Sequence, residues 1–333
     1  MFDVVCRARR LAVLCGTLGA FLGCGDSPSP ARPSVVPSQP PTGLAAGTIL
    51  SVASGEDGRP IAAAKVTVAG RVYESDGSGQ LTLADPAAWG TLVDLVSPGF
   101  LDRQTLVRRD GGTRFVLWPL LPGMGFDEDY TAQLVYTFGT RDAPPRGSSP
   151  LRRMRPSTTQ AFVLVTPEIW ADEGMRAAHE SGVALITAAN GGRIVYGVGT
   201  ARPTSGVVFE AKVDSAEPFC GDRFLAFTQV SVAGNDIVGG RIVYCQPEAA
   251  KTETVTHELG HTFGLHHSLE WRELMAGVSQ RGRAHDFGPR ETLAMSLFFE
   301  RRAGNRFPDN DRDIPASGRD TITIVCPESP GLL

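Results

Sequence analysis

The sequence lacks a strong excess of charge of either sign. Its 333 residues carry 32 Lys and Arg against 36 Asp and Glu, a formal net charge of −4 at pH 7. Proteins that bind nucleic acid as their main partner carry a clustered basic surface, so we expect no nucleic-acid partner. The chain has no internal repeat, and its length is that of two domains rather than one.

Long apolar runs are also missing. The N-terminal run "LAVLCGTLGAFLG" (residues 11–23) has about 13 residues, whereas a membrane-spanning helix needs about 20. The basic stretch "MFDVVCRARR" precedes it. A short apolar core after a basic start is typical of a secretory signal peptide, which is removed from the mature protein.

The end of this signal, "FLGCGDSPSP", resembles the boundary of a bacterial lipoprotein signal. The resemblance implies that residues 1–23 are removed and that Cys24 is lipidated, although Phe21 stands where the usual box has Leu. A plain secretory signal cleaved nearby is the alternative. Either way the mature chain leaves the cytoplasm. We expect it in the bacterial cell envelope, anchored by lipid to the outer membrane or the cell surface.

Cysteine is scarce, and export changes what the six cysteines can do. Two leave with the signal, Cys24 carries the lipid, and Cys220, Cys245 and Cys326 remain. In an oxidising compartment we expect a disulfide between Cys220 and Cys245, which stabilises by about 3 kcal/mol on the chain-entropy model. Cys326 is then left over. Three buried free thiols are the alternative.

The first part of the mature chain reads as a tether and a β module. Residues 24–43 are rich in Pro and Ser and predict a semi-extended tether. In residues 44–118 short apolar strands such as "AKVTVAG" alternate with turns such as "DGSG", which predicts a small β-sandwich. The pattern "GRPIAAAKVTV", followed by "DGSGQ", resembles the carboxypeptidase regulatory-like domains. That resemblance implies a transthyretin-type sandwich and no chemistry.

Residues 119–333 mix helix and strand signals. A short strand, "FVLVT", leads into a helix that we expect to start with Thr166 as N-cap and Pro167 at the first position. Four strand candidates follow between residues 192 and 245. A helix is predicted over residues 247–264, and a last one from Pro289.

Four of the six histidines lie in "THELGHTFGLHHS", residues 256–268. On a helix His257 and His261 project from one face, and Glu258 points about 100° away. A catalytic zinc needs three protein ligands and an open position for water. Gly264 can end the helix by adopting the left-handed conformation, and His267 follows three residues later.

The run "HELGHTFGLHH" (residues 257–267) resembles the zinc-binding motif of the metzincin peptidases. The sequence "RELMAG" places Met275 eight residues after the last histidine, where that family has a methionine turn. The resemblance implies one catalytic Zn²⁺ on His257, His261 and His267, with Glu258 as general base and Met275 packed beneath. It also implies a twisted mixed sheet with an active-site helix.

Further implications of this resemblance concern substrate binding. An edge strand above the cleft should pair with the backbone of a polypeptide substrate. The order of elements places this strand at residues 224–232, with Phe227, Gln229 and Ser231 on it. Gly277 stands where some relatives have a tyrosine ligand, so no such ligand is expected.

The remaining polar candidates are interpreted as ordinary solvated residues. We expect His266, His179 and His285 to face solvent. The alternating acidic residues of "FPDNDRD" hint at Ca²⁺, but Ile314 stands where a calcium loop has glycine, so a solvated acidic turn is favoured. These acidic residues are Asp309, Asp311 and Asp313.

The sequence therefore predicts an α+β multidomain protein, with the β-sandwich over residues 44–118 and a metzincin-like domain over 119–333. We expect a monomeric zinc endopeptidase that cleaves extracellular or periplasmic proteins. The alternative is a surface-binding or adhesion lipoprotein that carries an accessory peptidase fold. The presence of every catalytic position argues against that alternative.

Overall fold

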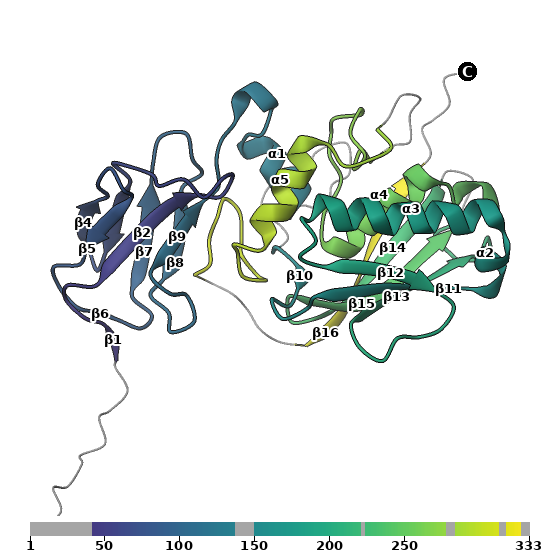
Figure 1. Ribbon diagram of the computed structural model, residues 1–333, viewed down its shortest axis with the longest axis horizontal. Coiled ribbons are helices and arrows are strands. Elements are labelled where there is room, and N and C mark those ends of the chain that lie inside the picture. Colours follow the sequence, from purple (N-terminus) through teal and green to yellow (C-terminus); the bar gives the residue numbers. More distant parts are fainter. Residues whose placement is uncertain (1–41, 137–149, 221–223, 278–283, 313–317, 328–333) are drawn as a thin grey trace, which may run out of the picture. The chain divides into compact units, whose positions relative to one another are not determined.

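The structure is a computed structural model that describes residues 42–136, 150–220, 224–277, 284–312 and 318–327 (Figure 1). The described residues all belong to one compact unit. The expected signal peptide, Cys24 and nearly all of the tether lie outside the described residues. Within the described part of the chain, no helix is both long and apolar enough to cross a membrane.

Residues 43–117 form two main β-sheets around a common core. Val66 and Val68 of β3 are buried while Lys65 is exposed, the alternation expected of a strand with one face on a core. The three-stranded sheet has the order β5-β2-β9 and the four-stranded sheet the order β4-β3-β7-β8. The strands of this part are β1 (Gly43–Leu44), β2 (Ile49–Ser54), β3 (Lys65–Val68), β4 (Arg71–Glu74), β5 (Gln80–Thr82), β6 (Ala87–Ala88), β7 (Leu92–Val96), β8 (Arg103–Leu106) and β9 (Arg114–Leu117).

The predicted "DGSG" turn carries the chain from one of these sheets to the other. It joins β4 of the four-stranded sheet to β5 of the three-stranded sheet. The Asp76 carboxylate accepts hydrogen bonds from the N–H groups of Ser78 (2.8 Å) and Gln80 (2.9 Å). Gly79 has a φ of 71°, which glycine adopts without strain.

A larger mixed sheet makes up the second part of the fold. Its order is β12-β11-β13-β15-β14-β16, with the short β10 paired to β15. β14 runs antiparallel to both of its neighbours. The strands are β10 (Arg153–Met154), β11 (Gln160–Val165), β12 (Val195–Gly199), β13 (Val207–Val213), β14 (Phe224–Ala233), β15 (Asp236–Tyr244) and β16 (Arg319–Pro327).

The helices of this part include two that pack side by side. A methyl group on Gly182 of α3 would lie 2.9 Å from Val255 of α4, so this glycine permits close approach of the two helices (Figure 1). The helices are α1 (Glu128–Tyr136), α2 (Pro167–Ala171), α3 (Glu173–Ala189), α4 (Thr252–Phe263) and α5 (Pro289–Phe298), with 3-10 turns at Pro122–Met124 and Pro247–Ala249.

The helix expected from Thr166 begins there but is interrupted. Pro167 is the first residue of α2, as predicted, and α2 ends at Ala171. Asp172 then acts as the N-cap of α3, because its carboxylate accepts the N–H of Met175 at 2.8 Å. His179 of α3 is fully buried and its Nδ1 lies 2.7 Å from the Met175 carbonyl oxygen. The prediction of a solvated His179 was therefore wrong.

The predicted edge strand is not at an edge. β14 pairs with β15 on one side and with β16 on the other. β16 was not predicted from the sequence, although its "TITIV" core is rich in β-branched residues, which favour strands. Taken together, the described chain is an α+β protein with several sheets and few helices.

Candidate metal centre

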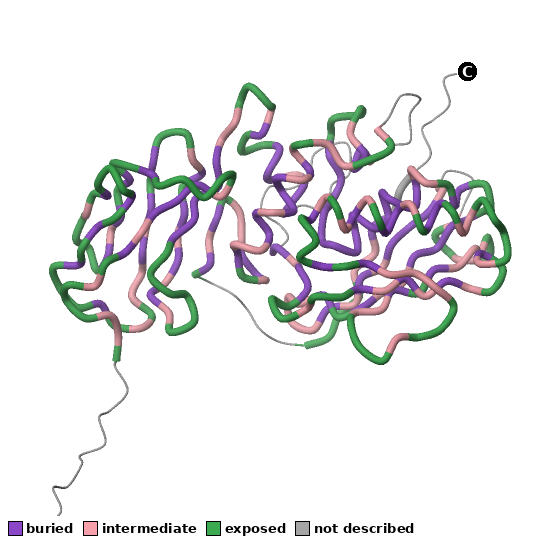
Figure 2. Tube along the Cα trace, in the orientation of Figure 1, coloured by how far each residue is buried: buried purple, intermediate pink, exposed green. Residues whose placement is uncertain are grey.

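Helix α4 carries two of the three candidate ligands and is buried along most of its length (Figure 2). It ends at Gly264, which has a φ of 119° and whose N–H reaches the carbonyl oxygens of Gly260 and His261. A methyl group at Gly264 would collide with the Arg152 carbonyl. Glycine is thus required at this turn, and the turn returns the chain toward His261.

The structure brings together the three histidines that the sequence singled out. One ring nitrogen from each of His257, His261 and His267 lies within 4.8 Å of those of the other two. All three side chains are buried. The ring centroid of His267 is 5.4 Å from that of His257 and 4.8 Å from that of His261.

Hydrogen bonds to backbone carbonyls orient two of these imidazoles. His257 Nδ1 lies 2.6 Å from the Leu274 carbonyl oxygen, and His261 Nδ1 lies 2.8 Å from that of Leu265. Since a carbonyl only accepts, each Nδ1 must carry the proton, and each Nε2 is left with a lone pair. Such carbonyl partners are typical of metal-binding histidines.

The spacing of these lone pairs fits a metal ion. The Nε2 atoms of His257 and His261 lie 3.1 Å apart. Two acceptors at this distance repel each other unless a cation lies between them. Tetrahedral zinc with Zn–N bonds of about 2.0–2.1 Å separates its nitrogen ligands by ~3.3 Å. The three residues can therefore hold a zinc ion.

Glu258 is held by a residue that was not predicted from the sequence. Thr228 of β14 donates its hydroxyl hydrogen to Oε2 of Glu258 at 2.6 Å. Both side chains are fully buried. A single threonine in a strand gives no signal in the sequence, because its role arises only when β14 packs against α4. We assign Thr228 as a positioning residue for the carboxylate.

Met275 packs against α4. It is fully buried, and a methyl group on Gly260 of α4 would collide with its sulfur. The Met275 carbonyl oxygen accepts the N–H of Ser268 at 2.8 Å, which ties the turn to the residue after the last histidine. Gly277 lies against that histidine, since a methyl group there would be 3.2 Å from the His267 ring.

Glu291 of α5 fixes the methionine turn from below. Its two carboxylate oxygens accept the N–H groups of Met275 and Gly288, each at 2.7 Å. Burial of the side chain raises the pKa of Glu291 to about 7, and the neighbouring Glu273 carboxylate contributes to the same upward shift. Glu291 was also missed, because nothing in the sequence relates a residue of α5 to the turn.

The raised pKa of Glu291 gives a prediction for stability. The folded protein keeps a proton on Glu291 that the unfolded chain loses near pH 4.5, so this group favours folding below that pH and its contribution disappears as pH rises to about 7. The measured quantity is the free energy of unfolding of the wild type minus that of Glu291→Gln. We expect this difference to fall by up to about 3 kcal/mol as the pH rises from 4.5 to 7.5. Denaturant unfolding at both pH values measures the difference. A difference between the two proteins that is independent of pH would contradict the assignment.

The two other histidines near the motif differ from each other. His266 was expected in solvent, but it is 3% exposed and the prediction was wrong. Its N–H donates to the Leu134 carbonyl at 2.8 Å, and burial lowers the pKa of its imidazole to about 3. His285 is an exposed loop residue, as expected, with its Nδ1 2.6 Å from Glu253.

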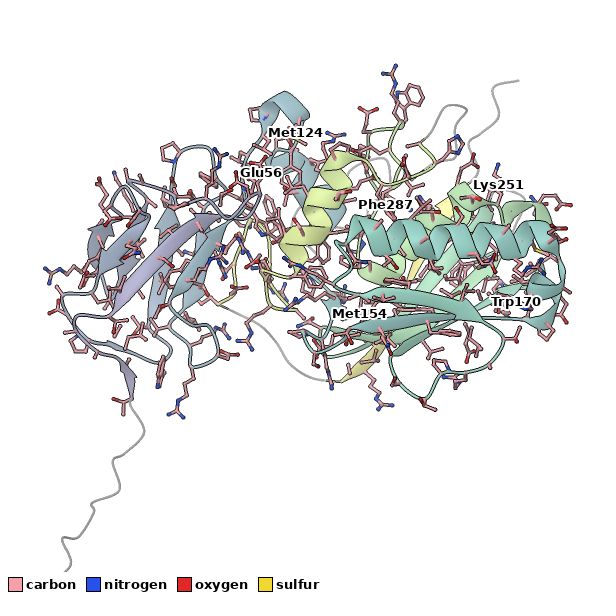
Figure 3. The ribbon with its side chains drawn as sticks, viewed as in Figure 1. Glu56, Met124, Met154, Trp170, Lys251 and Phe287 are labelled. Atoms are coloured by element: carbon pink, nitrogen blue, oxygen red, sulfur yellow. A yellow bond between two sulfur atoms is a disulfide. The ribbon has the colours of Figure 1, made fainter. Side chains whose placement is uncertain are left out.

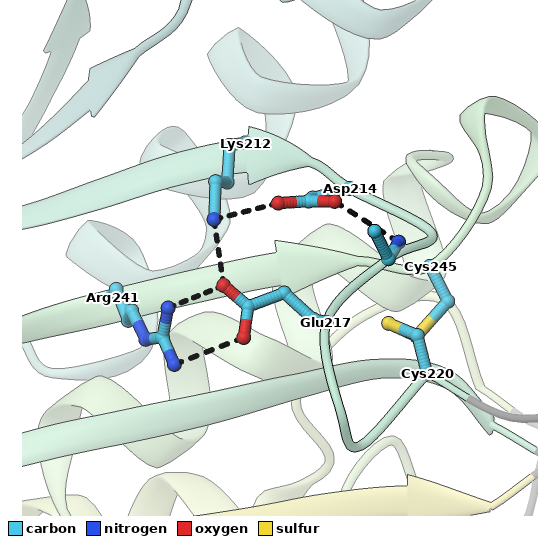
Figure 4. The surroundings of a disulfide bond; sticks show 7 residues. Lys212, Asp214, Glu217, Cys220, Arg241 and Cys245 are labelled. Carbon is cyan, nitrogen blue, oxygen red and sulfur yellow. Dashed lines mark hydrogen bonds and ion pairs between the residues drawn. A yellow bond between two sulfur atoms is a disulfide. The ribbon is translucent and has the colours of Figure 1, made fainter.

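Cys220 and Cys245 form a disulfide (Figure 4). It links the segment that precedes β14 to the end of β15, which leads into α4. Beside it, Glu217 accepts hydrogen bonds from Lys212 Nζ at 2.6 Å and from Arg241 Nη1 at 2.5 Å. These contacts join the segment around Glu217 to β13 and β15.

The three residues named for substrate binding lie in the interior of the sheet. Phe227 is fully buried and its ring contacts that of Phe219 at 5.3 Å. Gln229 donates its amide hydrogen to Thr323 of β16 at 2.8 Å, and Ser231 is paired with Thr321. The prediction that Phe227, Gln229 and Ser231 line a free edge was wrong, because the C-terminal strand already occupies that edge.

The acidic turn is neither solvated nor open to Ca²⁺. Asp309 and Asp311 are 0% and 1% exposed. Both oxygens of Asp309 accept hydrogen bonds from Arg301, and those of Asp311 accept from Arg103 and Asn305. The oxygens that calcium would need are thus engaged by protein donors. Asp313 lies outside the described residues, and of Cys326 only the backbone pairing is described.

Comparison with known proteins does not identify a family for this chain. No family model matches the sequence, and no curated protein matches it. Among the solved structures that match is the crystal structure of metalloproteinase-II from Bacteroides fragilis, at 12% identity and a TM-score of 0.31, with 76% of this chain and 87% of that chain covered. A TM-score this low carries no argument about fold or activity. The three histidines, Glu258 and Thr228 must therefore support a function by their own geometry.

Proposed function

We propose that the protein is a zinc-dependent endopeptidase of the metzincin type. The observation that carries the proposal is the pair of facing Nε2 atoms of His257 and His261, 3.1 Å apart, with both Nδ1 atoms committed to carbonyl oxygens. Two lone pairs at this distance repel each other, and a metal ion bound between them would remove that repulsion. His267 would supply the third nitrogen, and a catalytic zinc needs three such protein ligands.

The chemistry assigned to the chain's own residues follows from this arrangement. A zinc ion bound by the three imidazoles supplies Lewis acidity that polarises a peptide carbonyl and acidifies a water molecule. Glu258 accepts the proton of the attacking water on its carboxylate and donates it to the leaving amine. Thr228 keeps Oε2 of Glu258 in place through its hydrogen bond.

The substrate in this proposal is a polypeptide, and its path is constrained by β16. An extended substrate backbone can pair with β14 only if β16 leaves it. The protein acts as an exported monomer, anchored through Cys24 to the envelope. Mass spectrometry of the mature N-terminus tests the anchor, and sedimentation tests the monomer.

A second function is favoured by the same strand. With β16 on β14, the chain can serve as a surface-binding lipoprotein in which the peptidase fold is an accessory. In that case the histidines hold zinc for structure alone. The two functions differ in whether zinc-loaded protein cuts peptide bonds.

One experiment separates the two. Zinc-loaded protein is incubated with unfolded casein, with and without a zinc chelator, beside a variant that ends at Gly318 and lacks β16. We expect cleavage by the full chain or by the shortened one, lost with chelator and restored by zinc. If neither zinc-loaded protein cleaves, with folding checked by circular dichroism, the binding function is correct and the peptidase proposal is wrong.

A further inference from the structure

A cavity lined by arginines lies apart from the histidine cluster. Its volume is about 590 Å³, and it shares no lining residue with the metal centre. Its walls come from residues 103–116, from the turn 233–236 between β14 and β15, and from residues 299–303 after α5. Four acidic residues line it, against six arginines: Arg103, Arg108, Arg114, Arg153, Arg301 and Arg302.

Several of these arginines have carboxylate partners. Arg301 is fully buried and makes two hydrogen bonds of 2.6 Å to Asp309. Arg103 donates to Asp311 at 2.8 Å. These ion pairs compensate the charge of both guanidinium groups, although Nε of Arg103 has no hydrogen-bond partner in the described part of the chain.

Arg153 has no such partner. It is 8% exposed, its Nε is buried without a hydrogen bond, and it forms no ion pair with any residue that the structure describes. It lies in β10 next to Met154, which packs into the hydrophobic core (Figure 3). Since neighbouring residues of a strand point to opposite sides, Arg153 is directed away from that core.

The nearby carboxylates do not form an ion pair with the buried guanidinium group of Arg153. Burial lowers the pKa of the Arg153 guanidinium, and Asp236, Asp311 and Glu300 raise it from beyond contact distance. Asp311 already accepts hydrogen bonds from Arg103 and Asn305, and Asp236 pairs with Arg155 at 3.1 Å. An uncompensated buried charge is costly. A buried group of this kind points to an ion or water molecule that binds beside it.

We infer that this cavity binds a small phosphate-bearing anion, with Arg153 as its central ligand. The Nε atoms of Arg103 and Arg108 are also buried and without hydrogen bonds. Together with Arg153, three guanidinium groups therefore have an N–H donor available for a ligand. Guanidinium groups bind phosphate in a bidentate manner. A phosphate has enough acceptor oxygens for three such groups, whereas a planar carboxylate has two.

The size of the cavity favours an organic phosphate over the free ion. Small-molecule sites have volumes of about 300–1,000 Å³, and the space here is larger than phosphate alone requires. The ligand would connect β8 and β9 with β10 and the segment after α5, because residues of all of them line the cavity. This site is independent of the proposed peptidase activity.

The test is calorimetric titration of the full chain, at constant ionic strength, with inorganic phosphate, glycerol 3-phosphate and the tricarboxylate tricarballylate. We expect a phosphate compound to bind more tightly than tricarballylate, and Arg153→Met to weaken that binding at least tenfold. Arg202→Met is the matched control, since Arg202 is an exposed arginine that pairs with Glu210 and does not line the cavity; it should bind as the wild type does.

Tighter binding of either phosphate compound supports the site and identifies a free or an esterified phosphate as its ligand. Arg108→Met provides a second variant, with an expected loss in the same direction, if Arg153→Met does not fold. Three results would overturn the inference. They are no binding of either phosphate compound, tighter binding of tricarballylate, and equal binding by wild type and Arg153→Met.

Discussion

Glu258→Gln is expected to abolish peptide hydrolysis while leaving zinc bound. Glutamine keeps the shape of the side chain and can still accept a hydrogen bond from Thr228, but it cannot take a proton from water. General-base catalysis contributes about 10²–10⁴-fold to rate, so kcat/KM should fall at least a hundredfold. The measurement is cleavage of a quenched peptide by zinc-loaded protein, with the metal content determined on the same sample.

Glu253→Gln is the matched control for this experiment. Glu253 lies in the first turn of the same helix and pairs with Lys251 and His285 on the surface. Its loss should leave kcat/KM within a factor of about two, as expected for a surface pair of small energy. Undiminished cleavage by Glu258→Gln would contradict the role of the carboxylate, whatever the control shows.

His267→Ala is expected to lose the metal. With only His257 and His261 left, the ion has two protein ligands in place of the three that a catalytic zinc site needs. Zinc affinity should fall by several orders of magnitude, and activity should disappear with it. Competition with a chromophoric chelator measures the affinity directly.

His266, the neighbour of His267 in the sequence, provides the control for this experiment. His266 is buried and held through its backbone by Leu134, and its imidazole is not part of the three-histidine cluster. His266→Gln should lower stability, because a packed buried ring is replaced, yet keep zinc at one ion per chain. Loss of zinc from His266→Gln with retention in His267→Ala would reverse the assignment of ligands.

The sequence predicted the local features well because they depend on local chemistry. His257 and His261 follow from helix periodicity and Gly264 from the need for a left-handed turn, whereas His267 was implied by the resemblance to the metzincin motif. Pro167 starts its helix for an equally local reason. The disulfide between Cys220 and Cys245 required only the assumption of an oxidising compartment.

Features that depend on packing between distant segments escaped prediction. β16 covers β14 from more than 80 residues away in the chain, so no local pattern marks β14 as an interior strand. Thr228 holds Glu258, and Glu291 holds the methionine turn, through hydrogen bonds from other elements. Asp309 and Asp311 looked like a solvated turn because their arginine partners are unknown until the chain folds.

The most direct test of the metal centre is X-ray absorption at the zinc edge on the purified full chain. We expect one zinc per chain with three imidazole nitrogens at about 2.0–2.1 Å and one further light ligand. Sulfur ligands, fewer than three imidazoles, or a chain that binds no zinc at all would contradict the proposed centre.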